Sequence, residues 1–198
     1  MFDYLCEATK SLFFSNIKLS VMSLNTQTIY AVRNIAQSMV IASITAPKAR
    51  GVNNMEVKVL EGEEIKTVSD HMVKMVEERG FPPFFKRDAL NILSGQALFL
   101  IGTRIRSTGI PACGLCGFGD CTEKDKHPDH PCSFNTGDLG IAIGSSVSIA
   151  IDNRVDNRVM FSVGKAVVEM GLLGEDIRIA YGIPLAVSSK NPFFDRNR

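Results

Sequence analysis

Four of the five cysteines in this sequence lie within twenty residues of one another, in the pattern C-x2-C-x4-C-x10-C. They are Cys113, Cys116, Cys121 and Cys132. A C-x2-C pair can present two thiolates to one ion or cluster edge, because the turn between them folds back. Tetrahedral sites of four sulfurs hold either zinc or an iron–sulfur cluster. The spacing therefore predicts one metal site that uses all four cysteines and leaves Cys6 uninvolved.

The residues between the cysteines favour iron–sulfur over other uses of the thiols. Gly114, Gly117 and Gly119 leave backbone N–H groups free to approach the sulfurs, and such contacts help to set the potential of a cluster. The gap before the last cysteine is longer than in two-cluster bacterial ferredoxins, so one cluster is expected. We interpret the site as a 4Fe-4S cluster, with zinc as the alternative. His127 and His130 would join only a mixed zinc site and otherwise belong to a solvated, charged loop.

Composition and charge limit the function classes. The formal net charge is +1 and no basic stripe stands out, so we expect neither nucleic acid nor a membrane surface as a partner. The longest apolar run, residues 139–151, is too short to cross a bilayer and is typical of a buried helix. Asp3 and Glu7 stand where a signal peptide would be cationic. A cytoplasmic protein is therefore expected, and its thiols would stay reduced.

The elements that must position these cysteines follow from apolar periodicity and turn residues. Helices are expected from Asn25, as the N-cap, to Pro47, from about 61 to Gly80, and over about 138–152 and 160–172. Strands are expected at 55–60, 97–102 and 177–181, the second of them central and covered on both faces. Residues 103–135 are predicted to be a long cysteine-rich loop, which a metal would organise. This mixture predicts an α+β domain with helices covering a small sheet.

From about Asn25 to its end, the chain resembles a group of bacterial and archaeal proteins labelled as containing a ferredoxin domain. Five stretches carry the resemblance: TAPKARGVNN (45–54), CGLCGFGDC (113–121), DLGIAIGSSVS (138–148), RVDNRVMFSVG (154–164) and YGIPLAVSSKNPFFDR (181–196). The resemblance implies a ferredoxin-type metal insert at about 103–135 within one domain spanning 25–198. Residues 1–24 are then an N-terminal extension.

The order of elements is more distantly similar to the FMN-dependent nitroreductases. That resemblance implies a mainly antiparallel sheet, a homodimer, and flavin held at the subunit interface beside the loop Ala46–Arg50. The chain departs from the pattern at Lys48, where a serine usually follows the proline, at Gly51 in place of asparagine, and at Met55 in place of tryptophan. An Arg-Arg-Ser phosphate clamp is also absent ahead of the first helix.

Three basic residues are the candidates for binding the phosphate of FMN: Lys48, Arg50 and Lys190. The alternative is that they are solvated surface charges, which is the usual role of lysine and arginine on polar loops. The leading hypothesis is an iron–sulfur redox protein, either an electron-transfer protein or a flavin-dependent oxidoreductase. The rival is a non-enzymatic binding module in which the metal only folds the loop. The sequence does not identify catalytic residues, a substrate or the redox partner.

Overall fold

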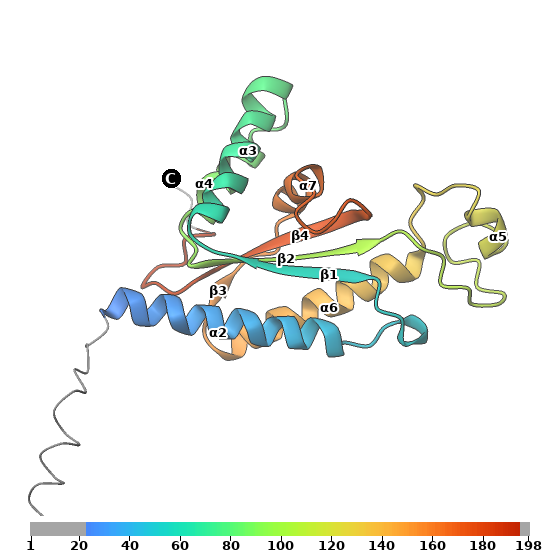
Figure 1. Cartoon of the computed structure of the whole chain (residues 1–198), viewed down its shortest axis with the longest axis horizontal. Coiled ribbons are helices and arrows are strands. Elements are labelled where there is room, and N and C mark those ends of the chain that lie inside the picture. The colour runs from blue at the N-terminus through green and yellow to red at the C-terminus, as the bar shows by residue number, and fades with distance from the viewer. Residues whose placement is uncertain (1–22, 195–198) are drawn as a thin grey trace, which may run out of the picture.

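A four-stranded antiparallel sheet lies at the centre of the protein, which the computed structural model describes from residue 23 to residue 194 (Figure 1). The strand order is β1-β2-β4-β3. The strands are β1 (Met55–Leu60), β2 (Ala97–Arg104), β3 (Asp156–Asn157) and β4 (Ile177–Ala186). Every pairing is antiparallel. The α+β class and the small antiparallel sheet expected from the sequence are confirmed.

Strand β2 carries apolar side chains to both faces of the sheet. Leu98 and Leu100 belong to one buried cluster, whereas Phe99 and Ile101 belong to the other. Because successive side chains of a strand point to opposite faces, a run of consecutive apolar residues requires cover on both sides. The interpretation of this run as a central strand is therefore confirmed.

The helices supply this cover in two layers (Figure 1). Helices α2 (Leu24–Thr45) and α6 (Ser133–Asp152) pack together on one face. Helices α3 (Glu63–Arg79), α4 (Phe84–Ile92) and α7 (Phe161–Glu169) cover the other. A 3-10 turn, η1 (Ala49–Gly51), precedes β1, and the short helix α5 (Cys121–Lys124) lies beyond one end of the sheet.

Two glycines allow α7 to approach β4 closely. A Cβ atom on Gly164 would lie 1.7 Å from the carbonyl oxygen of Ala180, and one on Gly182 would lie 2.1 Å from Val163 Cγ1. Both distances are far below van der Waals contact. Glycine is therefore required on each side of this contact between helix and strand.

Several predicted boundaries were wrong. The N-cap of α2 is Ser23, whose hydroxyl accepts a hydrogen bond from the backbone N–H of Thr26 at 3.2 Å, and not Asn25. Helix α4 was not expected, and α7 ends three residues before the predicted helix end at 172. Strand β4 runs five residues beyond Tyr181, because these residues continue the pairing with β2 down to Ala97.

The cysteine-rich segment is also more ordered than a loop over 103–135. Strand β2 continues to Arg104, α5 begins at Cys121, and α6 begins at Ser133 rather than at 138. Cys132 directly precedes α6, and its carbonyl oxygen accepts from the backbone N–H of Asn135 at 2.9 Å. Cys6 and nearly all of the proposed N-terminal extension lie outside the described residues. Within residues 23–194, no helix is long and apolar enough to span a bilayer.

Candidate metal centre

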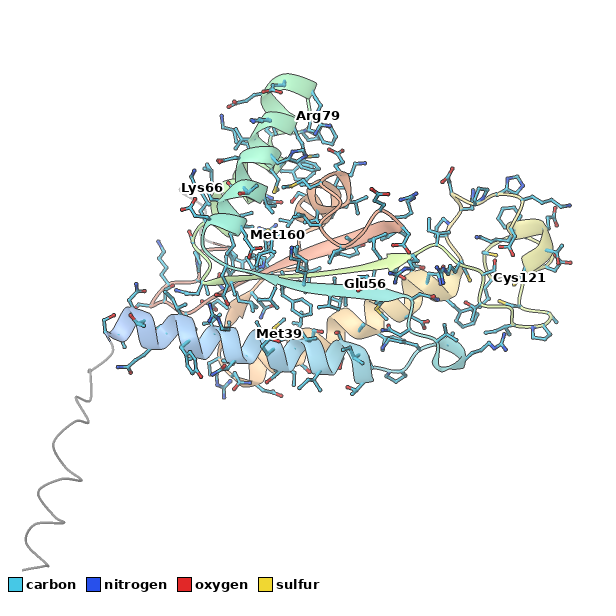
Figure 2. The ribbon with its side chains drawn as sticks, viewed as in Figure 1. Met39, Glu56, Lys66, Arg79, Cys121 and Met160 are labelled. Carbon is cyan, nitrogen blue, oxygen red and sulfur yellow. The ribbon has the colours of Figure 1, made fainter. Side chains whose placement is uncertain are left out.

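The cysteines lie at one end of the sheet, where the chain leaves β2 and returns as α6. Figure 2 shows Cys121 far from Met39 and Met160, which mark the two sides of the core. One hydrogen bond joins the two ends of this segment. Asn135 Oδ1 accepts a hydrogen bond from the backbone N–H of Arg106 at 2.9 Å, and Asn135 is itself buried. This bond joins the residues just after β2 to the first turn of α6.

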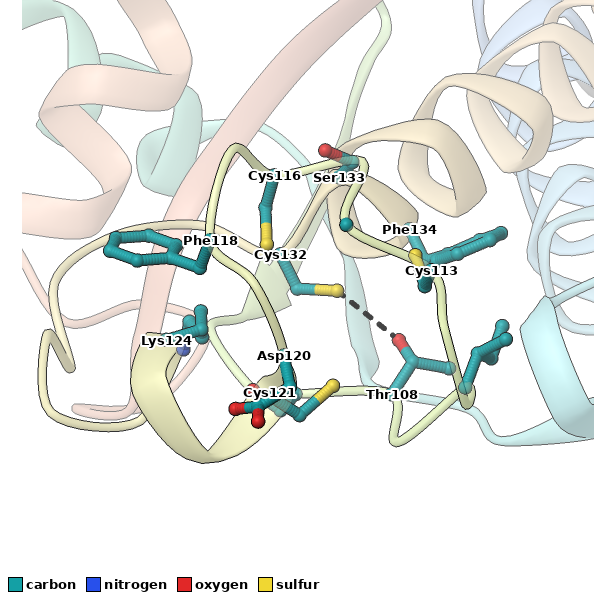
Figure 3. A pocket seen from close by; sticks show the side chains of 13 residues that line it. Thr108, Cys113, Cys116, Phe118, Asp120, Cys121, Lys124, Cys132, Ser133 and Phe134 are labelled. Atoms are coloured by element: carbon teal, nitrogen blue, oxygen red, sulfur yellow. Dashed lines mark hydrogen bonds between the residues drawn. The ribbon is translucent and has the colours of Figure 1, made fainter.

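All four cysteines line a single small cavity of about 20 Å³. Cys113 and Cys116 come from the loop after Pro111, Cys121 opens α5, and Cys132 precedes α6. Figure 3 shows their sulfur atoms lying around a common space. The other residues of the wall are Ser107, Thr108, Ile110, Gly114, Phe118, Asp120, Lys124, Ser133 and Phe134. The structure therefore brings together the four residues predicted as metal ligands.

Cys132 is the most buried of the four cysteines, and its surroundings shift the pKa of its thiol. Its Sγ lies 3.4 Å from Thr108 Oγ1 (Figure 3). Burial raises the pKa of the Cys132 thiol, but the Thr108 hydroxyl and backbone and the backbone N–H groups of Phe134 and Asn135 together bring it below its usual value. The last two amides belong to the first turn of α6, and that of Asn135 also donates to the carbonyl oxygen of Cys132 at 2.9 Å. They favour the thiolate, which is the form that binds a metal.

The four thiols lie at different positions along the wall of the cavity. Among the described residues, no three Cys, His, Asp or Glu side chains are placed to hold a single metal ion. A zinc ion about 2.3 Å from each thiolate requires sulfurs only about 4 Å apart. A cluster is larger, because several iron and sulfide atoms lie between its thiolates. Four cysteine thiols are the donor set that either a zinc ion or an iron–sulfur cluster accepts.

The two histidines of the segment lie on Phe118, away from the thiols. His127 stacks on the Phe118 ring with centroids 5.1 Å apart, and His130 meets the ring edge-on at 5.3 Å. Neither histidine is among the described residues that line the cavity. Both histidines therefore pack on the ring of Phe118, and Phe118 itself lines the cavity.

Lys48 holds the C-terminal end of α2. Its Nζ donates hydrogen bonds at 2.8 Å to the carbonyl oxygens of Ser43, Ile44 and Ala46. These carbonyls belong to the last turn of a helix, where no following N–H group is available to them. Burial lowers the pKa of Lys48, and the charge of Asp138 opposes that effect. Its ammonium group is thus directed at protein carbonyls.

Arg50 joins the η1 turn to the cysteine-rich segment. Its Nη1 donates to the carbonyl oxygens of Thr108 at 3.1 Å and Gly109 at 3.3 Å. The backbone of Arg50 has a φ of 57°, in the left-handed region that non-glycine residues rarely adopt. Its guanidinium contacts hold Thr108, which in turn contacts Cys132.

Lys190, the third basic candidate, lies elsewhere. It follows β4, whose last residues pair with the beginning of β2, whereas the cysteine-rich segment follows the end of β2. Lys190 is exposed in this position. Within one chain, the structure therefore brings Lys48 and Arg50 into the same region but does not bring Lys190 there.

A second, wider hollow adjoins the cysteine cavity. It is an open hollow of about 410 Å³ and is mainly apolar, with Ser133 and Phe134 common to both hollows. We call it the apolar groove; it is lined by Pro47, Lys48, Ala49, Leu115, Ser133, Phe134, Gly137, Asp138 and Ile141. The backbone N–H of Ala49 donates to both carboxylate oxygens of Asp138 at 3.1 Å. This bond fixes the Pro47–Ala49 loop against α6.

Sequence reasoning did not single out Thr108, Lys124, Phe134 or Asp138. Thr108 and Phe134 carry no distinctive pattern. Lys124 lies in the charged stretch EKDK, which is typical of a solvated loop, yet its side chain is only 3% exposed. Asp138 could have been noticed as the acid that opens the resembling stretch at 138–148.

Comparison with known proteins gives one family match and one close relative. Residues 129–196 match the family described as "uncharacterized protein containing a ferredoxin domain" (DUF2148). A protein of Archaeoglobus fulgidus, described as uncharacterized, is 34% identical over 172 residues, which cover 83% of this chain and 91% of that protein.

Solved structures with a similar arrangement include several flavoproteins. A BluB-like flavoprotein from Clostridium difficile 630 has a TM-score of 0.56 at 17% identity, covering 80% of this chain and 81% of that one. A nitroreductase family protein from Clostridium novyi NT has a TM-score of 0.54 at 13% identity, with coverages of 78% and 74%. A nitroreductase with bound FMN from Desulfitobacterium hafniense DCB-2 scores 0.52 at 13% identity, with coverages of 79% and 78%. The fold is therefore nitroreductase-like.

Proposed function

Because this chain belongs to the family of uncharacterized proteins that contain a ferredoxin domain, we propose that it is an iron–sulfur redox protein. In this proposal Cys113, Cys116, Cys121 and Cys132 hold one 4Fe-4S cluster. When bound, such a cluster supplies one-electron transfer. The observation that carries the proposal is the convergence of all four thiols on one cavity.

The other residues of the cavity would prepare the site for the cluster. Phe118, Ile110 and Phe134 supply apolar walls beside the sulfurs. Thr108 holds its hydroxyl against Cys132, and the first turn of α6 directs backbone N–H groups at the same sulfur. Hydrogen bonds to thiolate sulfurs and exclusion of solvent are two means by which proteins set cluster potentials.

Anaerobic reconstitution with iron and sulfide tests the proposal. We expect a brown protein that absorbs near 400 nm, with about four iron atoms and four sulfides per chain by analysis. A Cys116→Ala, Cys121→Ala double variant should lose the iron, and a Cys6→Ala variant should keep it. Stoichiometric zinc with colourless protein would instead support the rival function, a metal-stabilised binding module. Metal retained by the double variant would contradict the ligand assignment.

A flavin-dependent oxidoreductase is the second candidate, and the apolar groove favours it. The groove is bounded by the Pro47–Ala49 loop, the equivalent of the loop that approaches flavin in the resembling nitroreductases. FMN transfers either one or two electrons, so it could link a one-electron cluster to a two-electron substrate. Lys48 and Arg50 adjoin this region, but their cationic groups bond to protein carbonyls.

Fluorescence titration of the reconstituted protein with FMN tests this second function. We expect binding in the micromolar range and its loss in Ile141→Asp, which adds a carboxylate beside Asp138 in the groove. Leu90→Asp is the matched control, because Leu90 is 56% exposed on α4, on the opposite face of the sheet, and Ile141 is 50% exposed. Absence of FMN binding at tens of micromolar would leave electron transfer as the function.

A homodimer is part of the same proposal. Helix α6 was expected to be covered on every side, yet its Ile141 and Ile151 are exposed in one chain. The adjacent helix α2 exposes Ile41 and Ile44. Apolar residues gathered on neighbouring helices are typical of surfaces that associate. Light scattering at micromolar concentration should give twice the mass of the chain, and Ile41→Glu should reduce it where Leu90→Glu does not.

A further inference from the structure

Lys124 is a buried lysine in the wall of the cysteine cavity. Its side chain is 3% exposed, although its neighbours Glu123, Asp125 and Lys126 are all exposed. It lines the cavity together with the four cysteines (Figure 3). It ends α5, the short helix that Cys121 begins, so the fold of the segment places this lysine and that ligand on one turn.

Burial of an ammonium group requires a compensating negative charge, because the loss of hydration costs several kcal/mol. The acids near Lys124 provide little of it. Asp125 Oδ1 lies 3.7 Å from the Lys124 Nζ, is 60% exposed, and also accepts a hydrogen bond from Ser107. Asp120 lines the cavity, but it is exposed and its carboxylate caps α5 by accepting from the backbone N–H of Glu123.

We propose that Lys124 is a positioning residue that neutralises charge on the cysteine-bound cluster and raises its reduction potential. The inference rests on the proposed iron–sulfur function. Four thiolates give the cavity a large negative charge, which is what a buried ammonium group lacks in this segment. Reduction adds one electron and makes no bond, so the reduced state carries one more negative charge. A fixed cation nearby therefore stabilises the reduced state more than the oxidised one.

Three variants of the reconstituted full-length protein test this role. Lys124→Met removes the charge and keeps an unbranched apolar side chain, Lys124→Arg keeps the charge, and Lys126→Met removes an exposed charge two residues away. The measurement is a potentiometric titration with dithionite and mediator dyes, followed by the absorbance near 400 nm. Iron content and melting temperature, with and without the cluster, are measured on the same samples.

Lys124→Met should lower the ratio of reduced to oxidised cluster at least tenfold at a fixed ambient potential, a shift of about 59 mV for a one-electron couple. Lys124→Arg should restore most of this loss, and Lys126→Met should leave the potential unchanged. Cluster loading should also raise the melting temperature less in Lys124→Met than in the unchanged protein.

The failures of the two proposals are distinguishable. If the unchanged protein binds no iron and sulfide, the iron–sulfur function itself is wrong. If all variants hold the cluster and Lys124→Met titrates at the same potential as the unchanged protein, the role of Lys124 is overturned. If Lys124→Met does not fold, the neutral variant Lys124→Gln replaces it. Equal reduction potentials in Lys124→Gln and Lys124→Arg would then overturn the role of Lys124.

Discussion

Replacement of Lys48 by methionine should destabilise the protein before any cofactor is added. Lys48 Nζ donates three hydrogen bonds of 2.8 Å to the carbonyl oxygens of Ser43, Ile44 and Ala46. Methionine keeps the length and apolar character of the stem but donates nothing. The last turn of α2 then loses its cap, and the positive charge that favours a helix C-terminus is lost as well.

The size of the effect follows from these three bonds. A hydrogen bond to a charged group contributes about 1.5–3 kcal/mol. One ammonium group serves all three carbonyls, and water can replace it at the carbonyls that the substitution exposes, so the bonds do not add fully. We expect a loss of about 2 kcal/mol in the free energy of unfolding, and therefore a fall of about 4–8 °C in melting temperature for a domain of this size.

Thermal unfolding of the metal-free, flavin-free protein measures this loss. Lys66→Met is the matched control, because Lys66 is a helical lysine whose ion pair with Asp70 is 3.6 Å long and whose side chain is 59% exposed. Removal of such a surface charge should change stability by less than about 0.5 kcal/mol.

A different pattern would refute the capping role. If Lys48→Met melted at the same temperature as Lys66→Met but bound FMN much more weakly, the lysine would serve the flavin phosphate. The carbonyl contacts would then be incidental. A loss of both stability and FMN binding would mean that the cap positions the loop that forms the apolar groove.

Three further substitutions test the packing and charge of the scaffold. Gly164→Ala should cost about 1–3 kcal/mol or more by chemical denaturation, because its Cβ would lie 1.7 Å from the Ala180 carbonyl oxygen. Ser162→Ala should cost about 1–3 kcal/mol in the same assay, since its hydroxyl donates to Asp88 Oδ2 at 2.6 Å in the buried core. Burial raises the pKa of Glu169, but hydrogen bonds from Arg79 and His71 and the charge of Lys165 bring it below the usual 4.5. A lowered carboxyl pKa stabilises the fold above pH 4.5 and the benefit is lost as pH falls through the folded value, so Glu169→Gln should cost about 0.5–1 kcal/mol at pH 7 and progressively less as pH falls below 4.5. An equal cost at neutral and at acidic pH would exclude a charge effect.

The sequence predicted the sheet well because its apolar pattern is strong. The run ALFLIG has no polar residue that could face solvent, and the strand it forms is central and covered on both faces. The alternation of apolar residues likewise located β1. The end of α3 was predicted from Gly80, which adopts a φ of 69° as the C-cap. These features are local, so tertiary structure did not have to be known.

The missed elements depend on contacts that are distant in sequence. Helix α4 begins directly after two prolines and holds Phe85, Ala89 and Ile92 in the core. Pro82 and Pro83 predict the end of α3, but their carbonyl oxygens also accept the first hydrogen bonds of α4, from Phe85 and Arg87. The early start of α6 has no N-cap signal in the sequence, since Cys132 is not a common N-cap residue, and its first turn is bonded to Arg106 through Asn135. The convergence of four thiols was predicted from spacing, whereas the burial of Lys124 was not, because nothing in EKDK separates a buried lysine from exposed ones.

The first turn of α6 connects the two halves of the proposed function. Ser133 and Phe134 line the cysteine cavity on one side and the apolar groove on the other. Cys132, which directly precedes this turn, contacts Thr108 Oγ1, and in the next turn of α6 Asp138 accepts hydrogen bonds from the backbone N–H of Ala49. A one-electron centre at the cysteines and a flat cofactor in the groove would then both adjoin Ser133 and Phe134. This arrangement favours electron exchange between the two sites within one chain, and it explains why a change at Phe134 should alter both the cluster absorbance and FMN binding, whereas a change at Phe118 should alter only the first.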